Sequence, residues 1–308
     1  MSRPRAVVFA YHDVGVRCLK TLLSGGLDIP LVVTVPDEPG EARWFASVAE
    51  TAREYGLPLV APDATDLPRL QPELARLAPD FLFSFYYRAM LADDMLACAR
   101  RGALNIHGSL LPKYRGRAPV NWAILNGERE SGATLHYMVS RADAGDIVDQ
   151  LAVPILTDDD AREVFAKVTA AAEIVLARSL PGLLDGTAAR RPQSIAPGQY
   201  FGRRRPEDGR IDWREPALRV HDLVRAVAPP FPGAFTDVGG RRLWIHRTRR
   251  TSDIVAGGAA RLFGRDGVCY AACADGSVLR IIAAADARGP VDLTQAAREW
   301  QAHPLQLL

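Results

Sequence analysis

The sequence predicts an α/β fold, a doubly wound and mostly parallel sheet, followed by a small β-rich, barrel-like part. In the first half, continuous apolar segments such as Ala6–Ala10 and Phe81–Phe85 alternate with amphipathic ones. Strands without alternation belong to parallel sheets that helices cover on both faces. Beyond the amphipathic segment Ala161–Leu180, shorter apolar segments lie between glycines, for example Ser277–Ala283. That pattern is typical of a small antiparallel barrel or sandwich.

Each element of the first half follows from local signals. Strands are expected where apolar residues run continuously, and helices where they recur every three or four residues. Glycine or proline ends a helix, as Gly25-Gly26 does early in the chain and as we expect of Pro181-Gly182. In chain order, the expected strands are Ala6–Ala10, Ile29–Val35, Pro58–Val60, Phe81–Phe85 and Ala103–Ile106, and the expected helices are Val14–Leu23, Arg43–Tyr55, Leu67–Leu77, Asp94–Arg100 and Ala161–Leu180.

A segment rich in proline, arginine and glycine divides the chain. We therefore expect a first domain over residues 1–190, a linker over 191–209, and a C-terminal β-rich, OB-like domain over 210–308. In the last of these, strands are predicted at Arg242–Arg247, Gly267–Ala274 and Ser277–Ala283.

Composition excludes several classes of protein. The 308 residues carry a formal net charge of +2, which gives no reason to expect nucleic acid as a partner. The apolar run Ala6–Ala10 is too short for a signal peptide, and no membrane insertion is expected. The four cysteines have no framework or metal-site spacing. We expect a cytoplasmic protein with free thiols and no metal.

Asn105 and His107 are the most informative pair in the chain. They are two positions apart at the end of a predicted strand, so their side chains share one face. Asp143 follows in a turn after another strand. An amide, an imidazole and a carboxylate are the groups that acyl transfer needs. The first strand, by contrast, leads into Phe9–Gly15 with one glycine, which argues against a dinucleotide cradle and a simple dehydrogenase.

These residues, together with the loop Leu111–Pro119, resemble the signature of the folate-dependent formyltransferases, the family that includes methionyl-tRNA, glycinamide ribonucleotide and sugar N-formyltransferases. Asp208–Trp213 and Val224–Phe235 are similar to the segments that join and open the C-terminal domain of that family. The resemblance implies a Rossmann-like formyltransferase catalytic domain with Asn105, His107 and Asp143 as its triad. It also implies 10-formyltetrahydrofolate as the formyl donor.

The family pattern also implies where the folate binds. The segment after Phe85 corresponds to the backbone that contacts the pterin, and the loop before Asp143 corresponds to its other side. Backbone donors and acceptors suit a flat pterin edge, and an arginine in the loop after His107 corresponds to a further contact. The implied folate-binding residues are Ala89, Met90, Leu91, Arg117, Val139, Ser140, Arg141 and Ala142.

Within the family, four segments resemble the formyltransferase domain of bacterial UDP-4-amino-4-deoxy-L-arabinose formyltransferases. They are Val8–Asp13, Ser84–Arg88, His107–Pro119 and Arg141–Gly145. This implies a nucleotide-sugar substrate formylated on its 4-amino group, in the pathway that adds aminoarabinose to lipid A in lipopolysaccharide and gives resistance to polymyxin. In enteric bacteria a dehydrogenase/decarboxylase domain follows. The sequence ends at Leu308, so that activity is expected on a separate polypeptide.

Other acceptors stay open. A different nucleotide amino sugar fits the same residues, and the base and sugar are not separable by sequence. Methionyl-tRNA fits less well, because the loop Pro36–Glu41 is acidic where the tRNA enzymes carry a basic insertion. A 10-formyltetrahydrofolate hydrolase uses a similar triad, and a non-catalytic folate-binding protein is a further alternative. Two more histidines have more than one interpretation. His136 is expected to be packed or hydrogen-bonded rather than a ligand. His12-Asp13 lies at a strand end where an amino sugar would approach, but Asp13 fits a helix N-cap equally well.

Overall fold

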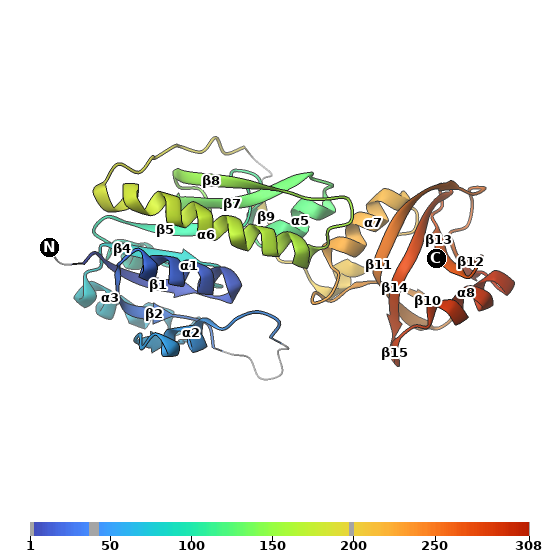
Figure 1. Ribbon diagram of the computed structural model, residues 1–308, viewed down its shortest axis with the longest axis horizontal. Coiled ribbons are helices and arrows are strands. Elements are labelled where there is room, and N and C mark those ends of the chain that lie inside the picture. The colour runs from blue at the N-terminus through green and yellow to red at the C-terminus, as the bar shows by residue number, and fades with distance from the viewer. Residues whose placement is uncertain (1–2, 37–42, 197–199, 308) are drawn as a thin grey trace. The chain divides into compact units, whose positions relative to one another are not determined.

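The computed structural model describes residues 3–36, 43–196 and 200–307 (Figure 1). The acidic segment Pro36–Glu41 lies outside these residues apart from Pro36. The chain forms two compact units. The first comprises Met1–Pro119, Ser131–Val153 and Phe165–Gly202, and the second comprises Val120–Glu130, Pro154–Val164 and Arg203–Leu308.

The first unit is built on a seven-stranded sheet. β1 pairs in parallel with β2 and β4, β2 with β3, and β4 with β5, whereas β7 runs antiparallel to β5. The predicted doubly wound, mostly parallel sheet is confirmed. In spatial order the strands are β3 (Leu59–Val60), β2 (Asp28–Val33), β1 (Arg5–Ala10), β4 (Phe81–Phe85), β5 (Gly102–His107), β7 (Glu130–Tyr137) and β8 (Ile147–Pro154).

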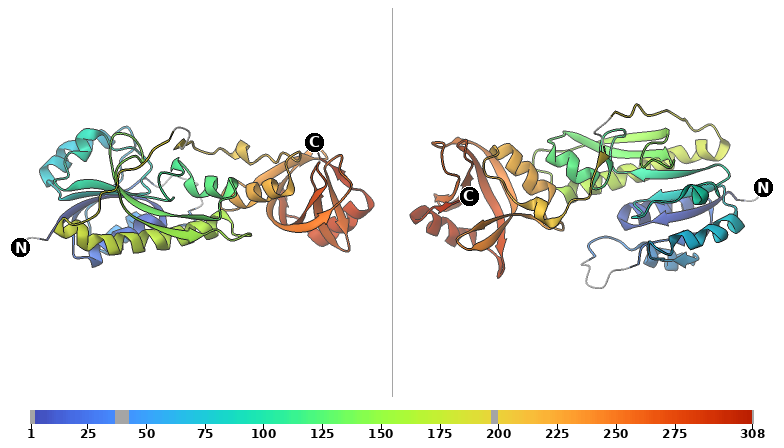
Figure 2. Two further views of the ribbon diagram at one scale, coloured as in Figure 1. Left: turned by 90° about the horizontal axis from the view of Figure 1, so that it is seen from above. Right: turned by 180° about the vertical axis from the view of Figure 1, so that it is seen from behind.

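Helices cover both faces of this sheet (Figure 2). On one face, leucines of α3 pack against β1, β2 and β4 together with Met95 of α4. α1 and α6 lie on the other face. The helices are α1 (His12–Ser24), α2 (Val48–Glu54), α3 (Gln71–Leu77), which follows the 3-10 turn η1 (Leu67–Leu70), α4 (Asp93–Leu96) and α6 (Ala161–Asp185).

Three helix boundaries differ from the expectation. α4 covers only Asp93–Leu96, and turn residues take the place of the rest of the helix expected at Asp94–Arg100. α2 begins at Val48 rather than Arg43, because the Ser47 hydroxyl accepts the N–H of Glu50 and caps the helix there. α6 continues through Pro181 to Asp185. Leu180 and Leu183 are both buried, so packing outweighs the hydrogen bond that proline removes.

The second unit is a nearly closed, antiparallel barrel-like sheet, as predicted. β11 pairs along most of its length with β14, and the sheet continues to β13 and β12. Its strands are, in spatial order, β10 (Ala234–Val238), β11 (Arg241–Ile254), β14 (Ser277–Asp286), β13 (Val268–Ala272), β12 (Arg261–Arg265) and β16 (Leu305–Gln306), with β15 (Gly289–Pro290) on β14. The helical elements of this unit are α5 (Pro119–Leu125), η2 (Pro206–Gly209), α7 (Ala217–Ala226) and α8 (Leu293–Ala302).

Two features of the first unit position the site. The chain leaves β1 toward β2 on one side and later returns to place β4 on the other, so strand order reverses between β1 and β4. Ligands of such sheets bind beyond the carboxyl ends of the strands at this point. In addition, β6 (Arg115–Gly116) pairs in parallel with β9 (Tyr200–Phe201), which ties the loop after β5 to a distant segment.

Within the part of the chain that the structure describes, no helix has the length and apolar character needed to cross a membrane.

Candidate active site

β5 carries Asn105 and His107 at its carboxyl end, between two strands that complete the site. β4 lies on one side, with Ser84 opposite Asn105, and β7 on the other, with His136 opposite Asn105. Because β7 is antiparallel, its end brings the following turn, with Asp143, back toward β5. The three residues of the predicted triad are thus joined through one strand and one turn.

His107 is held at both ring nitrogens. Its Nε2 lies 2.8 Å from the carbonyl oxygen of Tyr114. A carbonyl only accepts hydrogen bonds, so Nε2 carries the proton of the neutral ring. Nδ1 lies 3.5 Å from Oδ1 of Asp143, and the imidazole is only 8% exposed. The nitrogen that faces the carboxylate is therefore the one that can take up a further proton.

Asp143 adopts a left-handed backbone with φ of 52°, which aspartate tolerates better than most residues. Its Oδ2 accepts the N–H of Gly116 at 2.9 Å. Burial alone would raise the pKa of the Asp143 carboxyl. The imidazoles of His107 and His136, which are protonated at the acid pH where a carboxyl titrates, and the Gly116 N–H outweigh burial and hold this pKa well below its usual range. The group is a carboxylate throughout the pH range in which enzymes work.

His136 is buried and hydrogen-bonded, as expected, and it also joins the triad. Its Nδ1 lies 2.8 Å from the carbonyl oxygen of Tyr137 and therefore donates, which leaves Nε2 as an acceptor. Nε2 lies 3.1 Å from Nδ2 of Asn105 and 3.6 Å from Oδ1 of Asp143. His136 thus orients the Asn105 amide. The contact between His136 and Asn105 follows from the antiparallel register of β5 with β7, in which the two residues are opposite each other. The sequence alone does not give this register.

The loop after β5 is fixed by side chains of β7 and by β9. The Thr134 hydroxyl donates to the carbonyl of Ser109 at 2.6 Å and accepts the N–H of Leu111 at 3.1 Å. Further along, a Cβ atom on Gly116 would lie 2.3 Å from the carbonyl oxygen of Phe201, so only glycine fits against β9. The Tyr114 carbonyl and the Gly116 N–H, which hold His107 and Asp143, both belong to this braced segment.

Residues 5–180 match the formyl transferase family, and residues 204–298 match the formyl transferase C-terminal domain. The chain belongs to the formyl transferase family. Among solved structures it is similar to WlaRD, a sugar 3N-formyl transferase studied with dTDP and 5-N-formyl-THF. The TM-score is 0.73 at 18% identity, over 95% of this chain and 99% of that one.

Two further formyltransferase structures share the fold. The N-formyltransferase from Helicobacter canadensis, in complex with folinic acid and dTDP-3-aminofucose, gives a TM-score of 0.72 at 19% identity, over 91% of this chain and 99% of that one. A 4-N formyltransferase from Francisella tularensis gives 0.63 at 20% identity, over 78% of this chain and 95% of that one.

The residues predicted to contact folate lie in three segments of this formyl transferase. Ala89, Met90 and Leu91 follow β4; Met90 is 60% exposed, whereas Leu91 is buried in the core. Arg117 is exposed and donates from Nη2 to the carbonyl of Arg88 at 3.2 Å, which links its loop to the segment after β4. The third segment follows β7: Val139 is 44% exposed, Ser140 and Arg141 are exposed, and Ala142 is half-buried.

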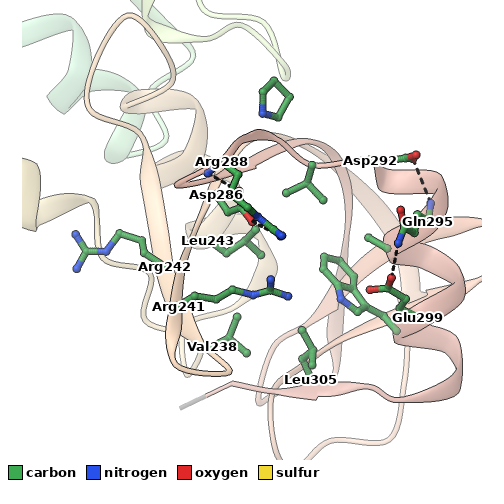
Figure 3. Close-up of a pocket in the computed structure, with 14 residues that line it drawn as sticks. Val238, Arg241, Arg242, Leu243, Asp286, Arg288, Asp292, Gln295, Glu299 and Leu305 are labelled. Carbon is green, nitrogen blue, oxygen red and sulfur yellow. Dashed lines mark hydrogen bonds and ion pairs between the residues drawn. The ribbon is translucent and has the colours of Figure 1, made fainter.

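A separate cavity of about 420 Å³ lies in the C-terminal unit (Figure 3). Val238, Leu243, Leu305 and Trp300 give it apolar walls, and Arg241 extends into it. Arg288 pairs with Asp286, and Gln295 donates to Glu299. No residue of the predicted site lines it. Among the residues described by the structure, no group of three or more histidine, cysteine, aspartate or glutamate side chains is arranged to hold a metal ion.

Proposed function

We propose that this formyl transferase moves the formyl group of 10-formyltetrahydrofolate to the amine of a nucleotide amino sugar, with Asn105, His107 and Asp143 as catalytic residues. The observation that carries the proposal is the position of Asp143, whose carboxylate lies 3.5 Å from Nδ1 of His107 while Nε2 is held by a backbone carbonyl. That arrangement leaves one nitrogen to handle a proton and stabilises the cation that results.

The folate supplies an activated formyl group: a bond forms between the amine nitrogen and the formyl carbon, the bond from that carbon to N10 breaks, and one proton passes from the amine to N10. His107 takes up this proton at Nδ1 and Asp143 stabilises the imidazolium. Asn105 uses one N–H for His136, and the other can donate to the formyl oxygen as negative charge develops there. Loss of such a donor costs about 10²–10³ in rate.

The surface around β5 combines exposed apolar side chains with backbone polar groups, which suits the face and the polar edge of a pterin ring. Met90 and Val139 are large apolar side chains that are 60% and 44% exposed. Met90 follows β4 and Val139 follows β7, and these two strands are the neighbours of β5. Exposed apolar side chains in the segments around a polar cluster are typical of a ligand site. We assign the pterin to this surface, with the backbone of residues 89–91 and 139–142 and the side chain of Arg117 around it.

The acceptor is proposed to be UDP-4-amino-4-deoxy-L-arabinose. Its support is the resemblance of the segments around Tyr11, Tyr86, His107 and Asp143 to that group of enzymes. The structural relatives named for dTDP sugars with 3-amino groups and for 4-N formylation support the wider class of nucleotide amino sugars. We place the reaction in the cytoplasm, where the four free cysteines of the chain remain reduced.

A transfer assay read by mass spectrometry tests the proposal. The enzyme is incubated with 10-formyltetrahydrofolate and, in parallel, with UDP-4-amino-4-deoxy-L-arabinose, dTDP sugars carrying a 3-amino or 4-amino group, methionyl-tRNA or no acceptor. A formyl mass gain on the UDP sugar supports the full proposal. A gain on a dTDP sugar alone retains the reaction and replaces the acceptor. Formylated tRNA, or formate released without any acceptor, contradicts the proposed function.

A further inference from the structure

His12 lies at the point where the order of strands in the sheet reverses. It comes shortly after β1, which pairs with β4. The Tyr11 N–H donates to the Phe85 carbonyl at 3.0 Å and so continues this pairing one residue beyond β1. β1, β4 and β5 lie side by side in that order, and neighbouring strands are about 4.8 Å apart, so β1 and β5 are about 10 Å apart across the sheet. This is the crevice in which sheets of this topology bind ligands.

The backbone of His12 is in the left-handed region, with φ of 67°. Residues other than glycine seldom adopt it, and it recurs where a side chain must be held in a particular direction. Here it turns the ring into a group of aromatic side chains. The imidazole stacks on Phe45 with centroids 3.9 Å apart and meets the rings of Trp44 and Phe165 edge-on, at 4.6 Å and 4.5 Å.

Burial keeps this ring neutral. Burial and, to a smaller extent, the charge of the nearby Arg88 together lower the pKa of His12 to about 3. Asp13 is the acidic group beside it, with Oδ2 3.5 Å from Nδ1. That carboxylate does not reverse the shift, and its Oδ1 is used by the Ala46 N–H at 2.9 Å.

The same surroundings fix which nitrogen carries the proton. The backbone N–H of Asp13 donates to Nδ1 of His12 at 2.9 Å, so Nδ1 is the acceptor and Nε2 bears the hydrogen. None of the residues described by the structure accepts a hydrogen bond from this Nε2–H. The side chain is 12% exposed, and a small hollow lined by Tyr11, His12, Thr34 and Phe45 opens beside it.

A positive charge lies close enough to influence the His12 ring. The guanidinium of Arg88 lies over the ring of Tyr11, 4.4 Å from its centroid, and its field reaches His12. A fixed N–H donor beside a guanidinium favours an anionic oxygen over a neutral one. The acceptor of the proposed reaction carries such oxygens in its diphosphate, one sugar ring away from the amine that must reach His107.

We propose that His12 is a specificity-determining residue that donates from Nε2 to an oxygen of the acceptor's diphosphate, beside Arg88. The inference rests on the proposed function and adds the residue that selects for a nucleotide sugar over a free amino sugar. The ring acts as a donor of fixed direction, because its tautomer, its stacking and its backbone conformation are all determined by neighbours.

Three variants test this assignment. His12→Phe keeps an aromatic ring and removes the donor, His12→Gln keeps a donor, and His12→Asn keeps a residue suited to the left-handed backbone but shortens its reach. His303→Phe is the matched control, since it makes the same exchange at an exposed position directly after α8, in the other unit. The readouts are kcat and KM for the nucleotide amino sugar that the wild type formylates, KM for 10-formyltetrahydrofolate, and Kd for UDP and dTDP by calorimetry.

His12→Phe and His12→Asn are expected to raise the acceptor KM and the Kd of UDP or dTDP by about ten- to a hundredfold, the value of a hydrogen bond to a charged group. KM for folate should be unchanged, and His12→Gln should recover part of the loss. Between pH 8 and pH 5 any change in Kd should come from protonation of the terminal phosphate of UDP or dTDP and should be the same in the wild type and His12→Phe, because the ring of His12 stays neutral there. Unchanged KM and Kd in both Phe and Asn variants would overturn the assignment, as would tighter binding below pH 6.5 that depends on His12.

The two proposals fail in different ways. If the wild type formylates no nucleotide amino sugar, the proposed function falls whatever the variants do. If it formylates one and His12→Phe leaves both KM and the Kd of UDP and dTDP unchanged, only the role of His12 falls.

Discussion

The Asp143 carboxylate and the Tyr114 carbonyl lie against opposite nitrogens of the same imidazole, at 3.5 Å and 2.8 Å from His107. The Tyr114 carbonyl, in the loop after β5, therefore orients the ring. The Asp143 carboxylate, in the turn after β7, stabilises the positive charge that the ring carries once it is protonated. Orientation and charge stabilisation are supplied by two separate parts of the chain, and each can be altered without the other.

Asp143→Asn is expected to lower kcat by about 10²–10⁴, because an amide does not stabilise the imidazolium that His107 forms. Steady-state kinetics with the acceptor found in the transfer assay measure the loss. Asp149→Asn is the control, since Asp149 pairs with Arg178 on the surface and should have activity close to wild type. Equal kcat in wild type and Asp143→Asn would remove the carboxylate from the mechanism.

His136→Ala is expected to lower kcat by about tenfold or more, because the Asn105 amide loses the acceptor that holds it at 3.1 Å. If His136 acts through Asn105, its removal should matter much less in an Asn105→Ala background. The four rates of this double-mutant cycle give the coupling. If the loss of kcat in the double variant equals the product of the two single losses, the two residues act independently. His246→Ala, on β11, is the control for replacing a histidine by alanine.

Gly108→Ala is expected to destabilise the protein by about 1–3 kcal/mol through overpacking. A Cβ atom at this position would lie 1.8 Å from the hydroxyl oxygen of Tyr86. That hydroxyl is buried and has no hydrogen-bond partner among the described residues, so Tyr86→Phe should be neutral or slightly stabilising. Urea unfolding of both single variants and the double variant measures this, and Tyr86→Phe should relieve part of the cost of Gly108→Ala. A double variant no more stable than Gly108→Ala would contradict the contact.

Acid should destabilise the protein through His12. Its pKa is about 3 in the folded protein and about 6.5 in the unfolded chain, so between these values the unfolded state binds more protons. The contribution of the neutral ring is complete above about pH 6.5 and is lost as pH falls toward 3. Relative to His12→Phe, the melting temperature of the wild type should therefore fall over this range. If the melting temperatures of the two proteins changed in the same way with pH, the burial of His12 would be contradicted.

Much of the first unit could be predicted because its strands are continuous apolar runs. β1 and β4 lie where Ala6–Ala10 and Phe81–Phe85 indicated, and α1 ends just before Gly25-Gly26. The extension of α6 past Pro181 could not, since burial of Leu183 outweighs a local helix-breaking signal. Of the candidate site, Asn105 and His107 follow from a period of two. His136 does not, because its relation to Asn105 depends on strand register.

The pairing of β6 with β9 has a consequence for any attempt to isolate the first domain. Phe201 accepts the N–H of Arg117 at 2.9 Å, and its ring stacks on Tyr114 with centroids 4.9 Å apart. A protein shortened after residue 190 would keep every triad residue in its sequence. It would lack Tyr200 and Phe201, against which the Tyr114–Gly116 segment is set, and with them the support for the two backbone groups that hold His107 and Asp143.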